Sequence, residues 1–360
     1  MPPLTSPSAR GTNPSSAALP IDCWYALADS ASVGRDLLGV RALDRPVLLY
    51  RTTDGRAVAL EDRCAHRAYP LSLGRLDGDV VRCGLCGFGH APDGACVAVP
   101  SQPQVPLGAR VAALPVAERD GLVWVWLGEP GRSVRHRVPE LPWLTGDGWG
   151  VVGGQREVDA GYLVLHENFA DVTQVPFVAP EIAPSVLGGQ APDLTVEVTE
   201  TTVTLRRTFP PAPLPGWQAS LVGAAAGDDY ATAHAGFFLS PAAWVDHWDV
   251  TGPDGSRARL RFTQLVTPVE AGRSRVLWRV SRDFAVGDAS AGTRVAGLFE
   301  EYYGRVFTAM ETVQAILDRD GPGPEVNVSA DVAALRVREI IAAMLAGQRP
   351  VRAAQRAAHP

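Results

Sequence analysis

Four residues in two short segments have the side chains and the spacing of a metal centre. Cys64 and His66 are separated by one residue, Cys83 and Cys86 are separated by two, and sixteen residues lie between the two pairs. Glycines in the second segment allow the tight turns with which loops bring ligands together. Thiolate and imidazole groups hold iron in iron–sulfur clusters and zinc in closed tetrahedral sites. The pattern therefore predicts that the four side chains converge on one metal centre.

The residues around these four extend the pattern beyond the ligands. Residues 61–67, 70–74 and 83–89 are similar to the two cluster-binding loops of a Rieske domain, and residues 123–128 are similar to its closing strand. Residues 22–130 together resemble the Rieske domain of an aromatic-ring-hydroxylating dioxygenase α subunit, from the family of Rieske non-heme iron oxygenases. This resemblance implies an all-β N-terminal domain with a [2Fe–2S] cluster.

One ligand position departs from the family pattern. A Rieske centre has two thiolates on one iron and two imidazoles on the other, and Cys86 stands at the position of the second histidine. Cys64, His66, Cys83 and Cys86 would then hold the cluster with Cys₃His ligation. The reduction potential would be lower, because an additional anionic ligand favours the oxidised state. Zinc in a Cys₃His site, or loops held by packing without metal, stay open as alternatives.

Three further residues near this motif are interpreted without a metal. His90 lies four residues after Cys86 and could replace a ligand. The family usually has an aromatic residue there, so we interpret His90 as an ordinary polar side chain. We interpret Cys96 and Cys23 as packed thiols.

A second motif of the same family lies further along the chain. Residues 168–179, NFADVTQVPFVA, are similar to the pattern N-x-x-D-x-x-H-x-P-F-V-H, whose histidines bind one ferrous iron in the family. A carboxylate from a long C-terminal helix completes that two-histidine-one-carboxylate site. Gln174 and Ala179 stand at the two histidine positions here, and Glu311 is the best match for the carboxylate. Three acidic residues of the same helix compete with it: Glu300, Glu301 and Asp318.

The replacements remove the donors of an iron site. Alanine has no donor atom, and glutamine offers a neutral amide oxygen in place of an imidazole, so we expect no mononuclear iron. In the family, the aspartate at the position of Asp171 bridges a cluster histidine and an iron-ligating histidine across a subunit boundary. Cys86 and Gln174 replace both histidines, so Asp171 alone remains of this former electron bridge.

A rebuilt iron site is conceivable from His166, Asp171 and His247. We interpret these histidines, together with His234 and Glu167, as core or pocket-lining side chains, because nothing in their spacing requires a metal.

Composition limits the partners and the location. The net charge is −6, all 33 basic residues are arginine, and no run of eighteen apolar residues occurs. Nucleic acid is therefore not an expected partner, and no membrane span is expected. The five cysteines are an odd number with metal-like spacing, which favours a reducing cytoplasm over a disulfide framework.

The chain divides into five predicted segments. We expect a disordered tail (1–20), a Rieske-type domain (21–130), a linker (131–149), an oxygenase catalytic-like domain (150–347) and a second tail (348–360). The expected fold class is α+β, with the all-β domain followed by a helix-grip-like domain of antiparallel sheet and long C-terminal helix. Alternating apolar residues predict hairpins over 194–207 and 257–282, and helical spacing predicts helices over 293–318 and 331–346.

The function that these features favour is a partner subunit without catalysis. The motif residues of the fold are retained, whereas the residues at the iron-ligand positions are replaced. This combination predicts a non-catalytic member of a homo- or hetero-trimer with an active, paralogous Rieske oxygenase subunit. One alternative is an atypical oxidoreductase that acts on an aromatic or other small organic substrate, in a pocket near Trp244, His247 and Trp248. The other is an electron-transfer iron–sulfur protein.

Overall fold

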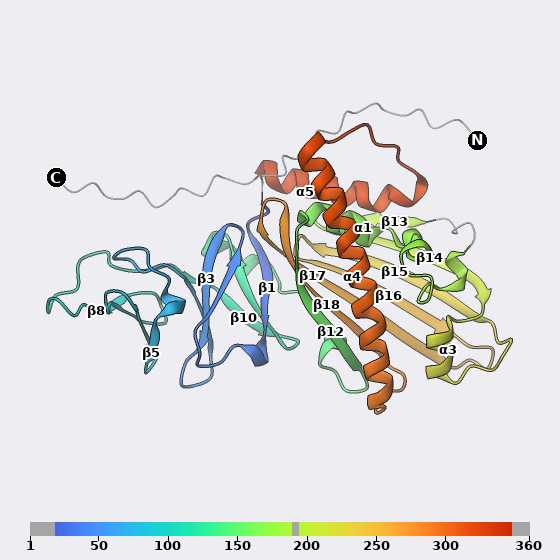
Figure 1. The fold of residues 1–360 in the computed structure, drawn as a ribbon, viewed down its shortest axis with the longest axis horizontal. Coiled ribbons are helices and arrows are strands. Elements are labelled where there is room, and N and C mark those ends of the chain that lie inside the picture. The colour runs from blue at the N-terminus through green and yellow to red at the C-terminus, as the bar shows by residue number, and fades with distance from the viewer. Residues whose placement is uncertain (1–18, 189–193, 348–360) are drawn as a thin grey trace.

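A computed structural model describes residues 19–188 and 194–347 of the chain. The predicted tails lie outside these residues, except for Leu19 and Pro20. Two domains follow each other along the chain and lie side by side (Figure 1). Within the described part of the chain, no helix is both long enough and apolar enough to cross a membrane.

The N-terminal domain consists of three small antiparallel sheets, as the predicted all-β fold requires. Their strand orders are β1-β11-β10, β2-β3-β4-β9 and β5-β6-β7-β8. The last strand, β11, has all six residues buried, because both of its faces are covered. The strands are β1 (Cys23–Asp29), β2 (Leu38–Ala42), β3 (Arg45–Arg51), β4 (Ala57–Glu61), β5 (Arg75–Asp77), β6 (Val80–Arg82), β7 (Gly89–His90), β8 (Cys96–Ala98), β9 (Ala113–Leu114), β10 (Val116–Arg119) and β11 (Leu122–Leu127).

The C-terminal domain is built on one antiparallel sheet of seven strands, in the order β12-β18-β17-β16-β15-β14-β13. Both predicted hairpins are confirmed: Val198 pairs with Val203 in the first, and Glu270 pairs with Arg273 in the second. The strands are β12 (Gly150–Val158), β13 (Thr195–Val198), β14 (Val203–Ala212), β15 (Tyr230–Ser240), β16 (Ala243–Thr251), β17 (Arg257–Glu270) and β18 (Arg273–Arg282).

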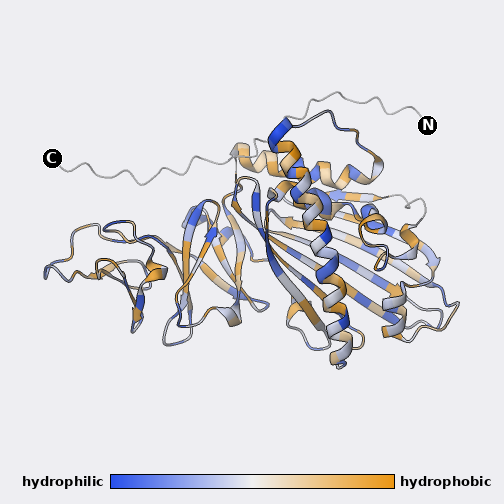
Figure 2. Ribbon diagram, viewed as in Figure 1, coloured by the Kyte–Doolittle hydropathy of each residue, from blue (hydrophilic) through white to orange (hydrophobic). Residues whose placement is uncertain are grey.

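A long helix, α4, lies across one face of this sheet (Figure 1). It begins where the Asp288 carboxylate accepts hydrogen bonds from the backbone N–H groups of Ser290 and Ala291, which satisfies two free donors of the first turn. Its buried residues include Val295, Phe299 and Val306, which are spaced along one side of the helix, and the ribbon of α4 alternates between hydrophilic and apolar segments (Figure 2). Both predicted helices are thus confirmed, as α4 and α5. The helices are α1 (Tyr162–Ala170), α2 (Val175–Val178), α3 (Gly216–Val222), α4 (Ala289–Asp320) and α5 (Val332–Gly347), and the short 3₁₀ turns include η5 (Val172–Gln174).

Hydrogen bonds join the two domains directly. The Leu43 N–H donates to the Pro268 carbonyl at 2.7 Å, and the Asp44 N–H donates to the Val269 carbonyl at 2.9 Å. The Thr267 hydroxyl donates to a carbonyl of β1 at 3.3 Å. The contact between β17 and the N-terminal domain therefore involves the backbone on both sides.

Candidate functional site

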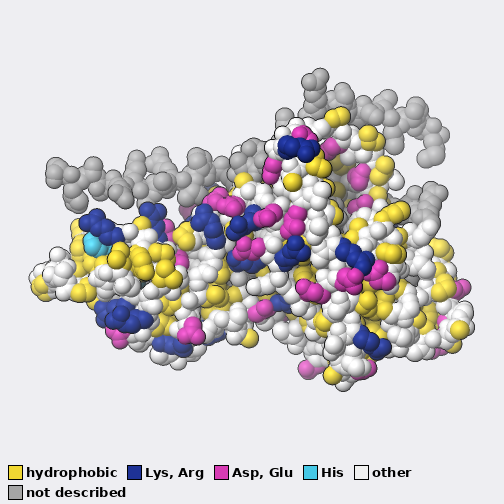
Figure 3. Space-filling model, viewed as in Figure 1, with side chains coloured by type: hydrophobic (Ala, Val, Ile, Leu, Met, Phe, Trp, Pro, Cys, Tyr) yellow, Lys and Arg dark blue, Asp and Glu magenta, His cyan; other side chains and the backbone are white. Residues whose placement is uncertain are grey.

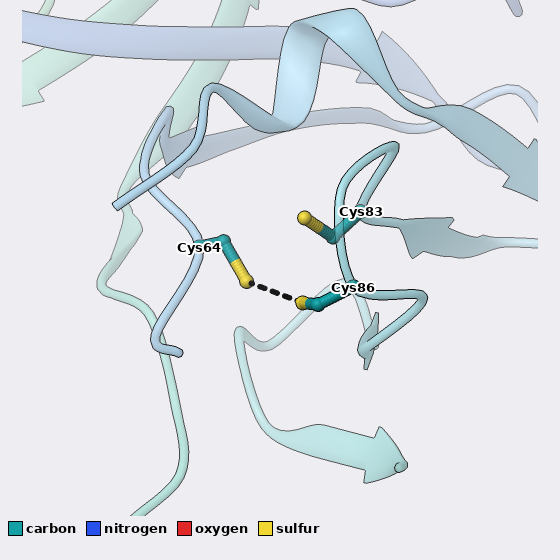
Figure 4. A group of neighbouring side chains, drawn as sticks. All are labelled: Cys64, Cys83 and Cys86. Atoms are coloured by element: carbon teal, nitrogen blue, oxygen red, sulfur yellow. Dashed lines mark hydrogen bonds between the residues drawn. The ribbon is translucent and has the colours of Figure 1, made fainter. Parts of the chain in front are cut away.

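The two loops of the first motif bring three sulfurs together (Figure 4). Cys64 follows β4, Cys83 follows β6, and Cys86 lies in the turn before β7. The Sγ atoms of Cys64 and Cys86 are 3.6 Å apart, and all three sulfurs lie within 4.8 Å of one another. Gly87 supports the turn with a φ of 72°, a left-handed conformation that glycine adopts without strain.

The surroundings of these sulfurs fit metal ligands. Burial raises the pKa of Cys64 to about 12. Burial acts in the same direction on Cys83, but the backbone N–H groups of Cys86 and Leu85 outweigh it and lower the pKa of that thiol. Backbone donors aimed at a sulfur stabilise its thiolate form, which is the form that binds metal. The three neighbouring thiols therefore fit the thiolate part of an iron–sulfur ligand set, and a cluster held there would supply one-electron redox chemistry.

The two histidines of this region lie in different environments. The His66 ring is exposed and stacks on Phe88, with ring centres 4.8 Å apart. His66 is not among the donors that lie within 4.8 Å of one another, so the structure brings together three of the four predicted ligands. His90 is completely buried, and its Nε2 lies 3.8 Å from Cys64 Sγ. The interpretation of His90 as an ordinary polar side chain therefore misses its position against a cluster sulfur. Burial lowers the pKa of His90, so its neutral form is favoured.

The other two thiols are packed away from this group. Cys96 Sγ faces the Ala98 carbonyl at 3.5 Å, and Cys23 Sγ faces the Ile21 carbonyl at 3.8 Å.

The second motif folds into three consecutive elements, α1, η5 and α2. Asp171 sits between α1 and η5, and its Oδ1 accepts hydrogen bonds from the Thr173 N–H at 2.9 Å and the Thr173 hydroxyl at 2.7 Å. Gln174 ends η5, and its Oε1 has no hydrogen-bond partner. Ala179 is completely buried in the core of the domain. The local fold of the motif thus forms with neither histidine.

Tyr302, and not Glu311, lies beside Gln174. Burial raises the pKa of the Tyr302 phenol, and a hydrogen bond with Gln174 opposes that shift. Glu311 lies nine residues further along α4, about 13 Å at the rise of an α-helix, and pairs with Arg156 of β12 at 3.1 Å. Gln174 and Tyr302 thus bring an amide and a phenol together, and neither is the imidazole or the carboxylate of a ferrous iron site, so these two residues do not fit that metal.

The alternative acidic residues of α4 also lie elsewhere. Glu301 pairs with Arg305, Asp318 accepts a hydrogen bond from Gln314 at 2.7 Å, and Glu300 lies against Gly154 of β12.

A buried polar network lies on the sheet below α4. The Asp246 carboxylate accepts hydrogen bonds from His234 Nε2 at 2.9 Å and from Trp244 Nε1 at 2.8 Å. Arg207 is only 3% exposed, and its Nε and Nη1 atoms have no hydrogen-bond partner. Burial lowers the pKa of Arg207, while Asp171 and Asp246 raise it. A permanent positive charge thus lies near the two carboxylates of this region.

A cavity of about 80 Å³ lies between the sheet and α4. Its wall is largely apolar and aromatic, with polar members that include Asp246 and Gln264, and Tyr302 lies beside them. Of the pocket residues predicted from sequence, Trp248 lines it.

The structure does not bring together His166, Asp171 and His247, the residues of the conceivable rebuilt iron site. Side chains alternate along β16, so Trp244 and Trp248 pack into the core below α1 and α4. His247 faces the other side of the sheet, where its ring meets Trp143 with centres 5.0 Å apart. His166 Nε2 donates to the Pro241 carbonyl at 2.9 Å. Glu167 is equally engaged, in an ion pair with Arg338 at 2.7 Å.

His166 should make the stability of the protein depend on pH. Burial lowers its pKa to about 4, whereas an unfolded histidine titrates near pH 6.5. Between these values only the unfolded chain takes up the proton, so the free energy of unfolding falls as the pH falls through this window, by roughly 3 kcal/mol in full. Urea unfolding at pH 7, 5.5 and 4.5 should show a flatter dependence for His166→Gln. The control His136→Gln, on an exposed residue, should keep the original slope; equal slopes in all three proteins would contradict the assignment.

Comparison with known proteins agrees with both domains. Residues 23–115 match the model of the Rieske [2Fe–2S] domain, and residues 158–347 match the model of the vanillate O-demethylase oxygenase C-terminal domain. The chain belongs to the family of Rieske oxygenases. Within it, the chain has the C-terminal domain of the vanillate O-demethylase oxygenase type.

Individual relatives are oxygenase components of multi-component systems. The iron–sulfur subunit of a toluene-4-sulfonate monooxygenase system from Comamonas testosteroni is 40% identical over 160 residues, which are 44% of this chain and 46% of the relative. The match thus spans about half the length of that relative. A vanillate O-demethylase oxygenase subunit from Pseudomonas sp. (strain ATCC 19151) is 25% identical over 85% of this chain and 96% of its own.

The fold matches that of dicamba monooxygenase. The crystal structure of that enzyme bound to 3,6-dichlorosalicylic acid has a TM-score of 0.83 at 24% identity, and the match covers 92% of this chain and 98% of the other.

Sequence reasoning missed two residues of the site, Tyr302 and Arg207, and it named His90 without placing it beside Cys64. Tyr302 could have been found from helical spacing, because it lies three residues from Phe299 on the apolar side of the helix. Arg207 lies two residues from Leu205 and from Phe209, which are buried on β14, so the period of two places this charge on the same inward face.

Proposed function

We propose that this chain is a subunit that carries an iron–sulfur cluster, holds no mononuclear iron, and assembles as a non-catalytic partner with an active Rieske oxygenase subunit. The observation that carries the proposal is the set of residues at the former iron position. Gln174 and Tyr302 lie together there, and Ala179 is buried without a donor atom. The fold around them, including Asp171 and the η5 turn, is kept. The five free cysteines favour a cytoplasmic location for this subunit.

Exposed apolar side chains support the partner role. Leu85, in the turn between two cluster cysteines, is 60% exposed, and Phe177, close to Asp171, is 87% exposed. Figure 3 shows further apolar side chains at the end of the molecule that carries β5 and β8. Exposed apolar groups favour protein contacts. Because Leu85 and Phe177 belong to different domains, a contact between them on successive subunits would run head to tail and could close a ring.

Co-expression with an active paralogous subunit tests this assembly. We expect the two chains to co-purify as a mixed oligomer of trimer size. Phe177→Glu should weaken that oligomer at least tenfold, because it places a charge in the contact. Val326→Glu is the matched control, since Val326 is 91% exposed in the loop between α4 and α5. Failure of the two wild-type chains to associate would reject the partner role.

A second candidate function is an atypical oxidoreductase with a small organic substrate. The cavity beside Tyr302 and Asp246 is the observation that favours it. Turnover of a small organic substrate by the isolated chain with its cluster reduced would support this candidate, and the absence of such turnover would count against it. The third candidate, an electron-transfer protein, is favoured by the cluster ligands alone and requires electron exchange with a reductase without any partner oxygenase.

A further inference from the structure

One side chain at the cluster loops has no role in the ligand set. His90 is fully buried on β7, and its Nε2 faces Cys64 Sγ at 3.8 Å. Its other ring nitrogen, Nδ1, is buried without a hydrogen-bond partner. A buried polar group without a partner costs free energy. The ring has two polar neighbours, the Cys64 sulfur and the Gly94 backbone.

The charge of that sulfur determines where the proton of the ring lies. A neutral imidazole carries one N–H and one lone pair. A proton on Nε2 lets the ring donate to the Cys64 thiolate. A proton on Nδ1 would aim the Nε2 lone pair at the thiolate and leave the neutral Gly94 backbone as the ring's hydrogen-bond partner, and a hydrogen bond to a charged acceptor is the stronger one. The first arrangement is therefore favoured.

We infer that His90 donates an N–H···S hydrogen bond to the cluster ligand Cys64 and thereby raises the reduction potential of the cluster. Hydrogen bonds to the sulfurs of a cluster are one of the factors that set its potential. The reduced cluster is more negative than the oxidised one by one charge, so a donor stabilises the reduced form more strongly.

In a site with three thiolates, this hydrogen bond acts against the effect of the third thiolate on the reduction potential. Cys86 in place of an imidazole adds a negative charge and lowers the potential. His90 opposes that effect from the buried side of the cluster. The inference concerns the cluster domain alone and does not depend on the fate of the second iron site.

The test uses the full chain with its cluster, purified without oxygen. His90→Phe keeps an aromatic ring of similar size and removes the N–H. We expect unchanged iron and sulfide per chain, and a reduction potential shifted to lower values in an EPR-monitored titration. His90→Gln, which keeps an N–H donor, should show a smaller shift. His136→Phe, on an exposed histidine outside the cluster loops, should leave the potential unchanged.

Two results would overturn the inference. An unchanged potential in His90→Phe would show that the N–H does not act on the cluster, and loss of iron and sulfide would show that His90 is a ligand. A measurement on the unmutated protein covers the case in which neither variant folds. With ¹⁵N-labelled histidine, pulsed EPR of the reduced cluster should show one strongly coupled nitrogen, the ligand atom of His66. It should also show two weakly coupled ring nitrogens, the remote one of His66 and the donor of His90. Two strongly coupled nitrogens, or a weak coupling from the remote nitrogen of His66 alone, would contradict the hydrogen bond.

Discussion

Restoring the missing donors at the former iron position should add one iron per chain. The change is the triple variant Gln174→His, Ala179→His and Tyr302→Asp, which rebuilds two imidazoles and a carboxylate. Three such ligands form the facial set that holds ferrous iron, and Gln174 and Tyr302 already lie together. Iron and sulfide are measured per chain after anaerobic purification. The unmutated chain should contain equal iron and sulfide, and the variant should contain one iron more.

A matched variant tests the position of the carboxylate. It carries the same two histidines, keeps Tyr302 and adds Glu311→Asp. Because Glu311 pairs with Arg156 away from Gln174, this variant should gain no iron. Ala179 is buried, and a larger side chain there is expected to cost about 1–3 kcal/mol, so thermal unfolding of each variant is followed in parallel. An additional iron in the unmutated chain would contradict the proposal of a lost iron site.

Removal of a single buried cysteine should abolish the cluster. Cys83→Ala deletes a thiol whose pKa is lowered by surrounding backbone N–H groups despite its burial. We expect nearly complete loss of iron, sulfide and visible absorption, because a cluster cannot form stably with one of its four ligands missing. The purified variant is compared with the parent by metal analysis and by its optical and EPR spectra.

Cys96→Ala is the control for this experiment. Cys96 is also buried in the N-terminal domain, but its sulfur faces a backbone carbonyl. This variant should keep its full iron and sulfide content. A Cys83→Ala protein with an unchanged cluster would contradict the ligand assignment. One zinc and no sulfide per parent chain would mean that the site is a structural zinc site and not a cluster.

Local sequence patterns were sufficient for most of the fold. Alternating residues predicted the β13–β14 and β17–β18 hairpins, and helical spacing predicted α4 within four residues at its N-terminal end, at Ala289 in place of residue 293. Both patterns record which face of an element is buried, and burial is a property of neighbouring residues.

Which side chains meet in the two sites depends on contacts between distant segments, and local sequence patterns do not predict such contacts. The register of α4 against η5 decided that Tyr302, and not Glu311, meets Gln174. The length of β7 and the packing of the cluster loops decided that His90 faces Cys64. Each of these contacts joins segments more than twenty residues apart, so neither follows from spacing within one element.

Arg207 gives the second domain a fixed source of positive charge. It lies buried near Asp171 and Asp246, in the domain that we propose to hold no mononuclear iron. The charge of a bound metal ion is lost when the metal is scarce or chelated, whereas a guanidinium is part of the chain and stays protonated. The folding of this domain should therefore be the same in iron-starved and iron-rich cells, and chelators should act on the N-terminal domain alone.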